Sequence, residues 1–284
     1  MRFGFVTCVE LGLACMQEIY ALGGRLDLAI TLRDDLATGK SGRVFLDPFC
    51  TERSIDLLKI RHVNDAESVA AIKEKQIDWL FIIGWSQIAG QEVLDAPKRG
   101  VLGIHPTLLP EGRGRAPIPW AIIKGLTQTG VTLFRLDGGV DTGDIAAQLV
   151  LPIDPRETAT SLYSRVQDAH RTLLRSVWDD LVANRISLRP QDESRATIWP
   201  GRKPEDGRIT WDMTVEEADR LVRGTTRPYP GAFWEANGEI VRIWAGEPVV
   251  DAEMDGPQLR IVLRDGTFAV TEYERCAVGT DAGR

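Results

Sequence analysis

The sequence predicts an α/β protein with an open, mostly parallel Rossmann-like sheet, helices on both faces, and a small β-rich C-terminal domain. Two observations predict this fold. In the first two-thirds of the chain, short apolar runs alternate with amphipathic stretches, a pattern typical of βαβ units. From about Arg189 the pattern changes to alternating apolar and polar residues separated by turn signals. We therefore expect a main domain over residues 1–188 and a second domain over residues 200–280.

Hydrophobic periodicity gives the elements of the main domain. The expected strands are Arg2–Cys8, Leu26–Leu32, Ile55–Ile60, Asp78–Gly84, Val101–His105, Gly130–Leu136 and Ile145–Ile153. The expected helices are Leu11–Leu22, Ala66–Lys75, Ala116–Gly125 with Pro117 in its first turn, and Ala159–Asn184. The polar, aperiodic stretch Asp34–Phe49 is expected to be a surface loop. The unbroken apolar run Asp78–Gly84 is typical of a central parallel strand buried on both faces.

The second domain follows a polar linker at residues 190–194. A helix is expected over Val215–Arg223, and alternating strands over Glu239–Trp244 and Gln258–Leu263. Turns are expected at residues 237–238 and 265–266, and the last residues, 278–284, are expected to be frayed.

Composition excludes several classes of protein. Hydrophobic residues make up 43 % and charged residues 26 %, as in an ordinary cytoplasmic globular protein, and no apolar run is long enough to span a bilayer. Glu10 interrupts the first apolar stretch, so we expect a strand and a helix there and not a signal peptide. Four scattered cysteines indicate reduced thiols, and three histidines without cysteine spacing argue against a metal. The net charge of −7 argues against a broad nucleic-acid-binding face.

The stretch from Gly103 to Ala116, GIHPTLLPEGRGRA, carries the first candidate site residues. His105 stands at the carboxyl end of an expected strand, where ligands of open α/β sheets bind. Imidazoles exchange protons near neutral pH, so this residue could serve as an acid or base. Arg113 and Arg115 would suit a phosphate or carboxylate. On spacing alone, a structural histidine and solvated arginines remain equally consistent with the pattern.

The stretch from Leu136 to Asp144, LDGGVDTGD, carries the second set. Its glycines would let the backbone approach a flat ligand closely, and its carboxylates could orient a histidine. A hairpin turn fits equally well, whereas a calcium loop does not, because the remaining ligands of an EF-hand are missing.

Taken together, HPTLLP…GRGRAPIPWAIIKG and TGVTLF…DGGVDTGDI resemble the folate-dependent formyltransferase family, which includes methionyl-tRNA, glycinamide-ribonucleotide and amino-sugar formyltransferases. Pro204–Trp211 and Pro228–Trp234 are similar to the C-terminal domain shared by the tRNA and sugar enzymes. The resemblance spans most of residues 1–250. It implies transfer of a formyl group from 10-formyltetrahydrofolate, as cosubstrate, to a primary amine, without a metal.

The resemblance also implies the site residues. The family's catalytic histidine and aspartate fall on His105 and Asp141, whereas its asparagine, which hydrogen-bonds the formyl oxygen, falls on Gly103. A backbone N–H, a water or Gln87 would have to replace that donor. The pterin ring of the donor is expected against one group of residues, with a glycine turn closing the other side: Ile83, Trp85, Gln87 and Ile88, then Gly138, Gly139 and Val140.

The acceptor is expected to be a nucleotide-linked amino sugar, such as a dTDP-, UDP- or GDP-linked 3-amino or 4-amino sugar. The tRNA enzymes usually read RGAAP, whereas RGRAP at Arg113–Pro117 is similar to the sugar enzymes. Thr107, Arg113 and Arg115 are the expected acceptor-binding residues, the arginines for a pyrophosphate. The Asp34–Phe49 stretch has only Lys40 and Arg43 as basic residues, which also disfavours tRNA.

Three alternatives stay open: methionyl-tRNA formylation, formylation of an amino-acid-type amine such as hydroxyornithine, and a folate-binding protein silenced by Gly103. A homodimer through the C-terminal domain is a further hypothesis. Neither a membrane nor a nucleic acid is expected as a partner.

Overall fold

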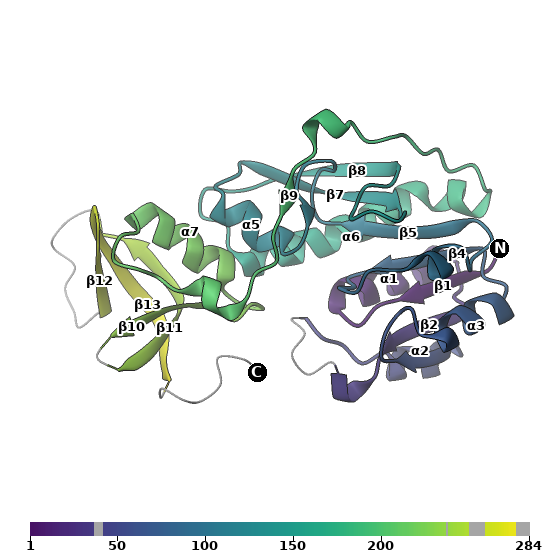
Figure 1. The fold of residues 1–284 in the computed structure, drawn as a ribbon, viewed down its shortest axis with the longest axis horizontal. Coiled ribbons are helices and arrows are strands. Elements are labelled where there is room, and N and C mark those ends of the chain that lie inside the picture. The colour runs from purple at the N-terminus through teal and green to yellow at the C-terminus, as the bar shows by residue number, and fades with distance from the viewer. Residues whose placement is uncertain (37–41, 237, 250–258, 277–284) are drawn as a thin grey trace. The chain divides into compact units, whose positions relative to one another are not determined.

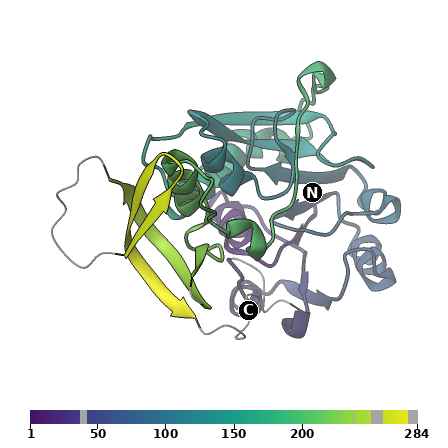
Figure 2. The ribbon, with the colours of Figure 1, turned by 60° about the vertical axis from the view of Figure 1, so that its left-hand side comes forward.

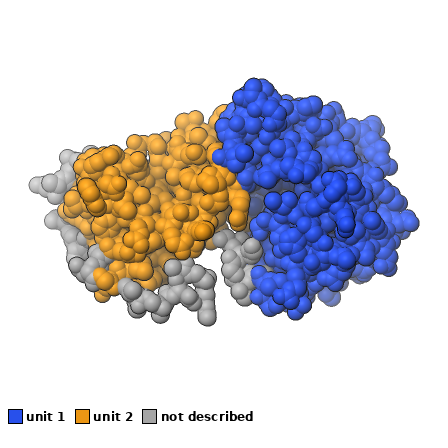
Figure 3. Space-filling model, viewed as in Figure 1, with its two compact units in different colours: residues 1–114, 129–151, 165–198 blue, residues 115–128, 152–164, 199–284 orange. Residues whose placement is uncertain are grey.

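The computed structural model describes residues 1–36, 42–236, 238–249 and 259–276 (Figure 1). The chain forms two compact units, coloured separately in Figure 3. The first unit comprises residues 1–114, 129–151 and 165–198, and the second comprises residues 115–128, 152–164 and 199–284. Each unit is therefore built from three segments of the chain. The continuous domain boundaries expected from the sequence, 1–188 and 200–280, remain a prediction.

The first unit is built on a mostly parallel seven-stranded sheet, as the sequence predicts. Its strands are β1 (Phe3–Val6), β2 (Leu28–Leu32), β3 (Asp56–Ile60), β4 (Trp79–Ile83), β5 (Gly100–His105), β7 (Gln128–Arg135) and β8 (Ile145–Pro152). The strand order is β3-β2-β1-β4-β5-β7-β8. The strands from β3 to β5 in this order are parallel, and β7 runs antiparallel to β5. The carboxyl ends of the parallel strands therefore share one edge, where β5 ends at His105.

Helices pack on both faces of this sheet. They are α1 (Glu10–Ala21), α2 (Asp47–Arg53), α3 (Ala66–Glu74), α4 (Gln91–Leu94) and α6 (Ala159–Val182), whose first residues belong to the second unit. On one face, Val6 and Leu80 pack in a core cluster with Ile72 of α3. On the opposite face, the ring of Phe3 lies 5.0 Å from that of Trp178 in α6. This division follows from the two-residue period of the strands, which sends successive side chains to opposite faces.

The stretch Asp34–Phe49 is not a single loop, so that expectation was wrong. A 3₁₀ turn occupies Asp34–Leu36, and α2 begins at Asp47. Pro48 lies in the first turn of α2, where its missing N–H removes no helical hydrogen bond. The helix is short and buries only Cys50, so it produces no readable periodicity. Lys40 lies outside the described residues.

The second unit combines a four-stranded antiparallel sheet with helices. Its elements are α5 (Pro117–Ile123), the 3₁₀ turn η3 (Pro204–Gly207), α7 (Val215–Thr225), β10 (Ala232–Ala236), β11 (Glu239–Pro248), β12 (Leu259–Leu263) and β13 (Gly266–Cys276). The strand order is β10-β11-β13-β12, and α7 lies against this sheet (Figure 2). Side chains of α7 and of the sheet form one hydrophobic cluster. Two very short strands, β6 (Arg113–Gly114) and β9 (Ile198–Trp199), form a separate ladder.

Local chemistry explains the ends of these elements. Thr214 and Glu217 form a reciprocal capping box that starts α7, and the structure confirms the predicted helix there. The β12–β13 turn consists of Arg264 and Asp265, one residue earlier than expected. Of the other predicted turn, Asn237 lies outside the described residues. So does the chain end, 278–284.

Three further expectations concern cysteines, metals and membranes. None of the four cysteines, all at described positions, forms a disulfide, and burial raises the pKa of the Cys15 thiol to about 12, so this thiol stays protonated. Within the described ranges, no group of three or more His, Cys, Asp or Glu residues could hold a metal ion. Over the same ranges, no helix is both long and apolar enough to cross a membrane.

Candidate functional site

His105 and Asp141 lie together at the carboxyl end of β5. The His105 side chain is almost fully buried, and its Nε2 lies 2.8 Å from the carbonyl oxygen of Gly112. Its Nδ1 lies 3.5 Å from Oδ2 of Asp141. Because a carbonyl oxygen only accepts hydrogen bonds, Nε2 carries the proton in its contact with the Gly112 carbonyl. The other ring nitrogen is therefore left facing the carboxylate.

Asp141 belongs to a tight turn between β7 and β8. Its Oδ2 also accepts a hydrogen bond of 2.8 Å from the backbone N–H of Gly114. Within the turn, the Thr142 hydroxyl donates to Oδ1 of Asp137 at 2.6 Å. A Cβ at Gly143 would lie 1.7 Å from a backbone oxygen of β7, so only glycine fits that position. The turn is thus fixed from several sides, and it places the carboxylate beside the imidazole.

A cavity of about 370 Å³ lies beside this turn. Its apolar side chains are Leu94, Val101 and Leu136, and three glycines, Gly100, Gly138 and Gly143, also line it. Its polar and charged side chains are Gln91, Asp95, Arg135, Asp137 and Asp144. Val101, Gly103 and His105 are alternate residues of β5, so all three share one face of the sheet. The cavity therefore adjoins the face of β5 that carries His105.

The sequence named Gly138 among these lining residues but missed the apolar ones. Strand periodicity counted back from His105 could have found Val101. No sequence signal pointed to Leu94, because it lies on the short helix α4, which was not predicted.

The expected pterin-binding residues at the end of β4, after it and on the Asp141 turn differ in burial. Ile83 is fully buried, and Ile88 is 67 % exposed. The Trp85 ring packs against the core cluster on the α3 face, and its buried Nε1 has no hydrogen-bond partner among the described residues. Gly139 and Val140 are exposed on the Asp141 turn. None of these residues belongs to the described lining of the cavity.

Gln87, considered above as a hydrogen-bond donor to the formyl oxygen, binds two backbone groups. Its Oε1 accepts from the N–H of Val63 at 2.8 Å, and its Nε2 donates to the carbonyl of Arg61 at 3.0 Å. The amide therefore fixes the loop after β3. Each polar atom has a backbone partner, but Nε2 carries a second N–H that neither of these hydrogen bonds uses.

Arg113 is buried and bound to protein partners. Its guanidinium donates to the Glu193 carboxylate at 2.5 and 2.9 Å and to Oε1 of Gln191 at 2.8 and 3.1 Å. The hydrogen bonds that Arg113 donates to the Glu193 carboxylate raise the pKa of Arg113 and lower the pKa of Glu193. These four hydrogen bonds leave the guanidinium few N–H donors for a ligand.

The other two expected acceptor-binding residues differ in exposure. Thr107 is 1 % exposed, and its Oγ1 has no hydrogen-bond partner among the described residues. Its carbonyl accepts from the Thr132 hydroxyl at 2.7 Å. Arg115 belongs to the second unit, where its side chain is exposed and its N–H donates to the carbonyl of Trp199 at 3.1 Å.

Cations gather around Trp120 in the second unit. Cζ of Arg202 lies 4.9 Å from the ring centroid, and Nζ of Lys124 lies 5.4 Å from it. The Arg115 side chain lies beside Gly201, the neighbour of Arg202. Burial lowers the pKa of Arg202. We call Arg115, Trp120, Lys124 and Arg202 the Trp120 cation cluster. No ion pair joins its cations to a carboxylate among the described residues, although the Asp206 carboxylate partly opposes the lowering of the Arg202 pKa.

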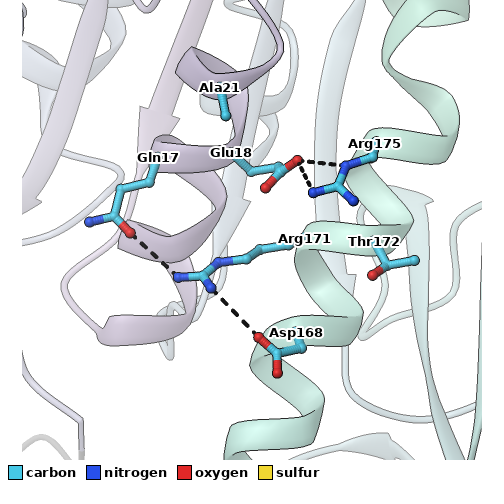
Figure 4. Close-up of a pocket in the computed structure, with 7 residues that line it drawn as sticks. All are labelled: Gln17, Glu18, Ala21, Asp168, Arg171, Thr172 and Arg175. Atoms are coloured by element: carbon cyan, nitrogen blue, oxygen red, sulfur yellow. Dashed lines mark hydrogen bonds and ion pairs between the residues drawn. The ribbon is translucent and has the colours of Figure 1, made fainter.

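A second cavity, of about 380 Å³, lies between α1 and α6 (Figure 4). Its charged side chains pair with one another. Arg175 meets the carboxylate of Glu18 at 2.7 Å, and Arg171 lies 3.6 Å from Asp168. This cavity is lined by neither His105 nor Asp141, and its Glu18–Arg175 ion pair joins the two helices.

Comparison with known proteins gives matches along most of the chain. The family model "Formyl transferase" matches residues 35–177, and the model "Formyl transferase, C-terminal domain" matches residues 202–284. A methionyl-tRNA formyltransferase from Geotalea uraniireducens (strain Rf4) is 32 % identical, over 96 % of this chain and 90 % of that protein.

Two solved structures share the fold. An N-formyltransferase from Helicobacter canadensis, in complex with folinic acid and dTDP-3-aminofucose, superposes with a TM-score of 0.72 at 17 % identity, over 96 % of this chain and 99 % of that one. HypX from Aquifex aeolicus, in complex with tetrahydrofolic acid, gives a TM-score of 0.68 at 21 % identity, over 96 % of this chain and 44 % of HypX.

Proposed function

This chain belongs to the formyl transferase family, with 10-formyltetrahydrofolate as the formyl donor, and we propose that its acceptor is the primary amine of a nucleotide-linked amino sugar. One observation carries the proposed chemistry. The His105 imidazole is held between a carbonyl and the Asp141 carboxylate at the end of a parallel strand. Such an arrangement suits a group that exchanges protons.

The proposed mechanism follows from the two ring nitrogens of His105. Nε2 donates its proton in a hydrogen bond to the Gly112 carbonyl, so Nδ1 is the nitrogen that takes the proton from the attacking amine. The nearby Asp141 carboxylate stabilises the imidazolium that forms. A new C–N bond joins the formyl carbon to the acceptor, the bond to the folate nitrogen breaks, and His105 returns the proton to that leaving nitrogen.

The cavity beside the Asp141 turn suits the pterin ring of the donor. Its volume of about 370 Å³ lies within the usual range for small-molecule sites. Leu94, Val101 and Leu136 offer an apolar surface to a flat ring, and the carboxylates of Asp137 and Asp144 can accept from ring N–H groups. Ile83, Trp85, Gln87 and Ile88 stay a prediction of donor contacts.

The formyl oxygen gains negative charge as the amine attacks, so it needs a hydrogen-bond donor. Gly103 provides no side chain, and the Gln87 amide is engaged by the Arg61–Val63 loop. A backbone N–H, a water or the second N–H of the Gln87 amide is therefore the proposed donor.

The Trp120 cation cluster supports an anionic acceptor. A nucleoside diphosphate brings negative phosphates, which guanidinium groups bind through paired hydrogen bonds, and a base that can stack on an aromatic ring. Arg115, Lys124 and Arg202 form no ion pair with a carboxylate among the described residues. We propose that Arg115 contacts the phosphates, whereas Arg113 supports the protein itself.

Methionyl-tRNA is the second candidate acceptor. The relative from Geotalea uraniireducens carries the name of a methionyl-tRNA formyltransferase and aligns with 96 % of this chain. A tRNA is also a polyanion that the cluster could bind.

A formylation screen read by mass spectrometry tests the proposal. The protein is incubated with 10-formyltetrahydrofolate and dTDP-, UDP- or GDP-amino sugars, N-hydroxyornithine, or methionyl-tRNA. His105→Ala is the inactive variant, and His62→Ala, at an exposed histidine, is the matched control. Formylation of an amino sugar by wild type and His62→Ala but not by His105→Ala supports the proposal.

Other outcomes separate the alternatives. Formylation of methionyl-tRNA alone, or of hydroxyornithine alone, would overturn the sugar assignment. Folate binding without any product would point to a scaffold silenced at Gly103.

A further inference from the structure

The polar segment Arg189–Thr197, predicted as part of a linker, contacts both sides of the His105–Asp141 pair. The backbone of Arg189 exchanges hydrogen bonds of 2.8 and 2.9 Å with Ile145 at the start of β8. At the other end, the Thr197 hydroxyl accepts from the N–H of Gly112 at 2.8 Å. The carbonyl of the same Gly112 is the partner of His105. The segment is therefore bound to the site and does not merely connect domains.

Gln191 is the centre of this contact. Its Nε2 donates to the backbone carbonyls of Asp141 and Gly143, at 2.8 and 2.7 Å. Its Oε1 accepts from the Arg113 guanidinium at 2.8 and 3.1 Å. Carbonyls only accept and a guanidinium only donates, so just one orientation of the amide satisfies all four bonds.

The turn that Gln191 binds has an unfavourable backbone. Asp141 has φ of 55°, in the left-handed region that residues with a side chain rarely adopt. Its carbonyl is one of the two that accept from Gln191. On the opposite side, Arg113 precedes Gly114, whose N–H donates to the Asp141 carboxylate. A single amide thus bridges the backbone of Asp141 and the strand that binds its side chain.

We propose that Gln191 is a positioning residue that holds the Asp141 turn so that the carboxylate faces Nδ1 of His105. The inference rests on the proposed roles of His105 and Asp141. It also gives Arg113 a function: with Glu193 as its second partner, Arg113 fixes the far end of the Gln191 amide. Gln191 itself touches neither substrate nor the reacting atoms.

The decisive variant is Gln191→Glu, which keeps the size and the acceptor for Arg113 but replaces the donor with an oxygen facing two carbonyls. We expect kcat to fall by about tenfold to a hundredfold with little change in either KM, because misplacing a catalytic group lowers the rate by such factors. In an Asp141→Asn background, the same substitution should lower kcat no further, because Gln191 acts through that carboxylate.

Gln148→Glu is the matched control. Gln148 also accepts from an arginine, Arg189, and donates to a backbone carbonyl, that of Leu109, but it contacts neither Asp141 nor Gly143. Its effect on kcat should be the same in the wild-type background and in the Asp141→Asn background. Wild-type kcat in Gln191→Glu, or an equal loss in both backgrounds, would overturn the inference.

Hydrogen exchange separates this inference from the proposed function. Whether or not the protein forms a product, Gln191→Glu should speed amide exchange in peptides covering residues 137–144, and Gln148→Glu should not. A wild type that formylates nothing but shows this change would contradict the proposed function while leaving the positioning contact intact. Unchanged exchange would contradict the positioning role itself.

Discussion

Gly103 and Leu136 share one space beside the candidate site: a Cβ added at Gly103 would lie 2.5 Å from Cδ1 of Leu136. The same added atom would lie 3.3 Å from the carbonyl oxygen of Ile82 and 3.4 Å from Cε1 of Phe134. The neighbours of Gly103 therefore leave no room for a side chain unless one of them moves. An asparagine at residue 103 therefore fits only if the Leu136 side chain shifts or is shortened.

We expect Gly103→Asn alone to lower the free energy of unfolding by about 1–3 kcal/mol, the usual effect of overpacking. In Gly103→Asn/Leu136→Ala the loss should be smaller than the sum of the two single losses, because the new amide fills the space that Leu136 vacates. Urea denaturation of the four proteins measures this coupling. Additive losses would contradict the close packing of these two positions.

Activity gives a separate prediction for the same pair. If the new amide donates to the formyl oxygen, kcat of the double variant should exceed that of Leu136→Ala by up to about a hundredfold. The comparison with Leu136→Ala controls for changes in the neighbouring cavity. Equal kcat values would show that another donor already serves the formyl oxygen.

Asp141→Asn should lower kcat by about a hundredfold or more, in the range usual for loss of acid–base catalysis. The carboxamide oxygen can still accept from Gly114, so the melting temperature should change little, while the charge beside His105 is lost. Asp180→Asn, at an exposed carboxylate of α6, is the control and should keep wild-type kcat. Near-normal kcat in Asp141→Asn would remove the carboxylate from the mechanism.

Gly138→Leu should block the donor cavity without disturbing the protein. A Cβ at Gly138 meets no atom within 4 Å, yet the residue lines the 370 Å³ cavity. We expect KM for 10-formyltetrahydrofolate to rise at least about tenfold, and the melting temperature to stay constant. Titration calorimetry with tetrahydrofolate checks the affinity directly. Unchanged affinity would place the pterin ring outside this cavity.

His170 predicts how stability depends on pH. Burial lowers its pKa from 6.5 to about 4, and its Nδ1 donates to the carbonyl of Val166 at 2.7 Å. Below pH 6.5 the unfolded chain therefore binds a proton that the folded chain does not, and stability is lost as pH falls from 6.5 through about 4. The full loss corresponds to about 3 kcal/mol.

His170→Gln keeps a donor for the Val166 carbonyl but does not titrate in this range. Urea denaturation at pH 7 and pH 4 should show a smaller drop in unfolding free energy for the variant than for wild type. Equal drops would mean that other groups determine the acid sensitivity.

Much of the fold was readable from the chain because it depends on local signals. Continuous apolar runs predicted the central strands β4 and β5, and the Thr214–Glu217 capping box accompanies a helix that periodicity had predicted. The segment Asp34–Phe49 was misread because α2 begins within it, at Asp47. This seven-residue helix buries one side chain and therefore shows no hydrophobic periodicity. Short elements of this kind are stabilised by contacts that the linear sequence does not show.

The sequence by itself determined most strands and the long helices of the main sheet, the placement of His105 at a strand end, and the family, because these follow from periodicity and contiguous motifs. Only the tertiary structure decided what each side chain meets. In the folded protein, Arg113 donates hydrogen bonds to Gln191 and Glu193, and the Gln87 amide binds the Arg61–Val63 loop. Gln191, in a segment predicted as a polar linker, donates to the backbone carbonyl of Asp141. The physical reason is that a hydrogen bond depends on a distance of about 3 Å between groups that can be far apart in the chain, 80 residues for Arg113 and Glu193, and no local pattern encodes such a distance.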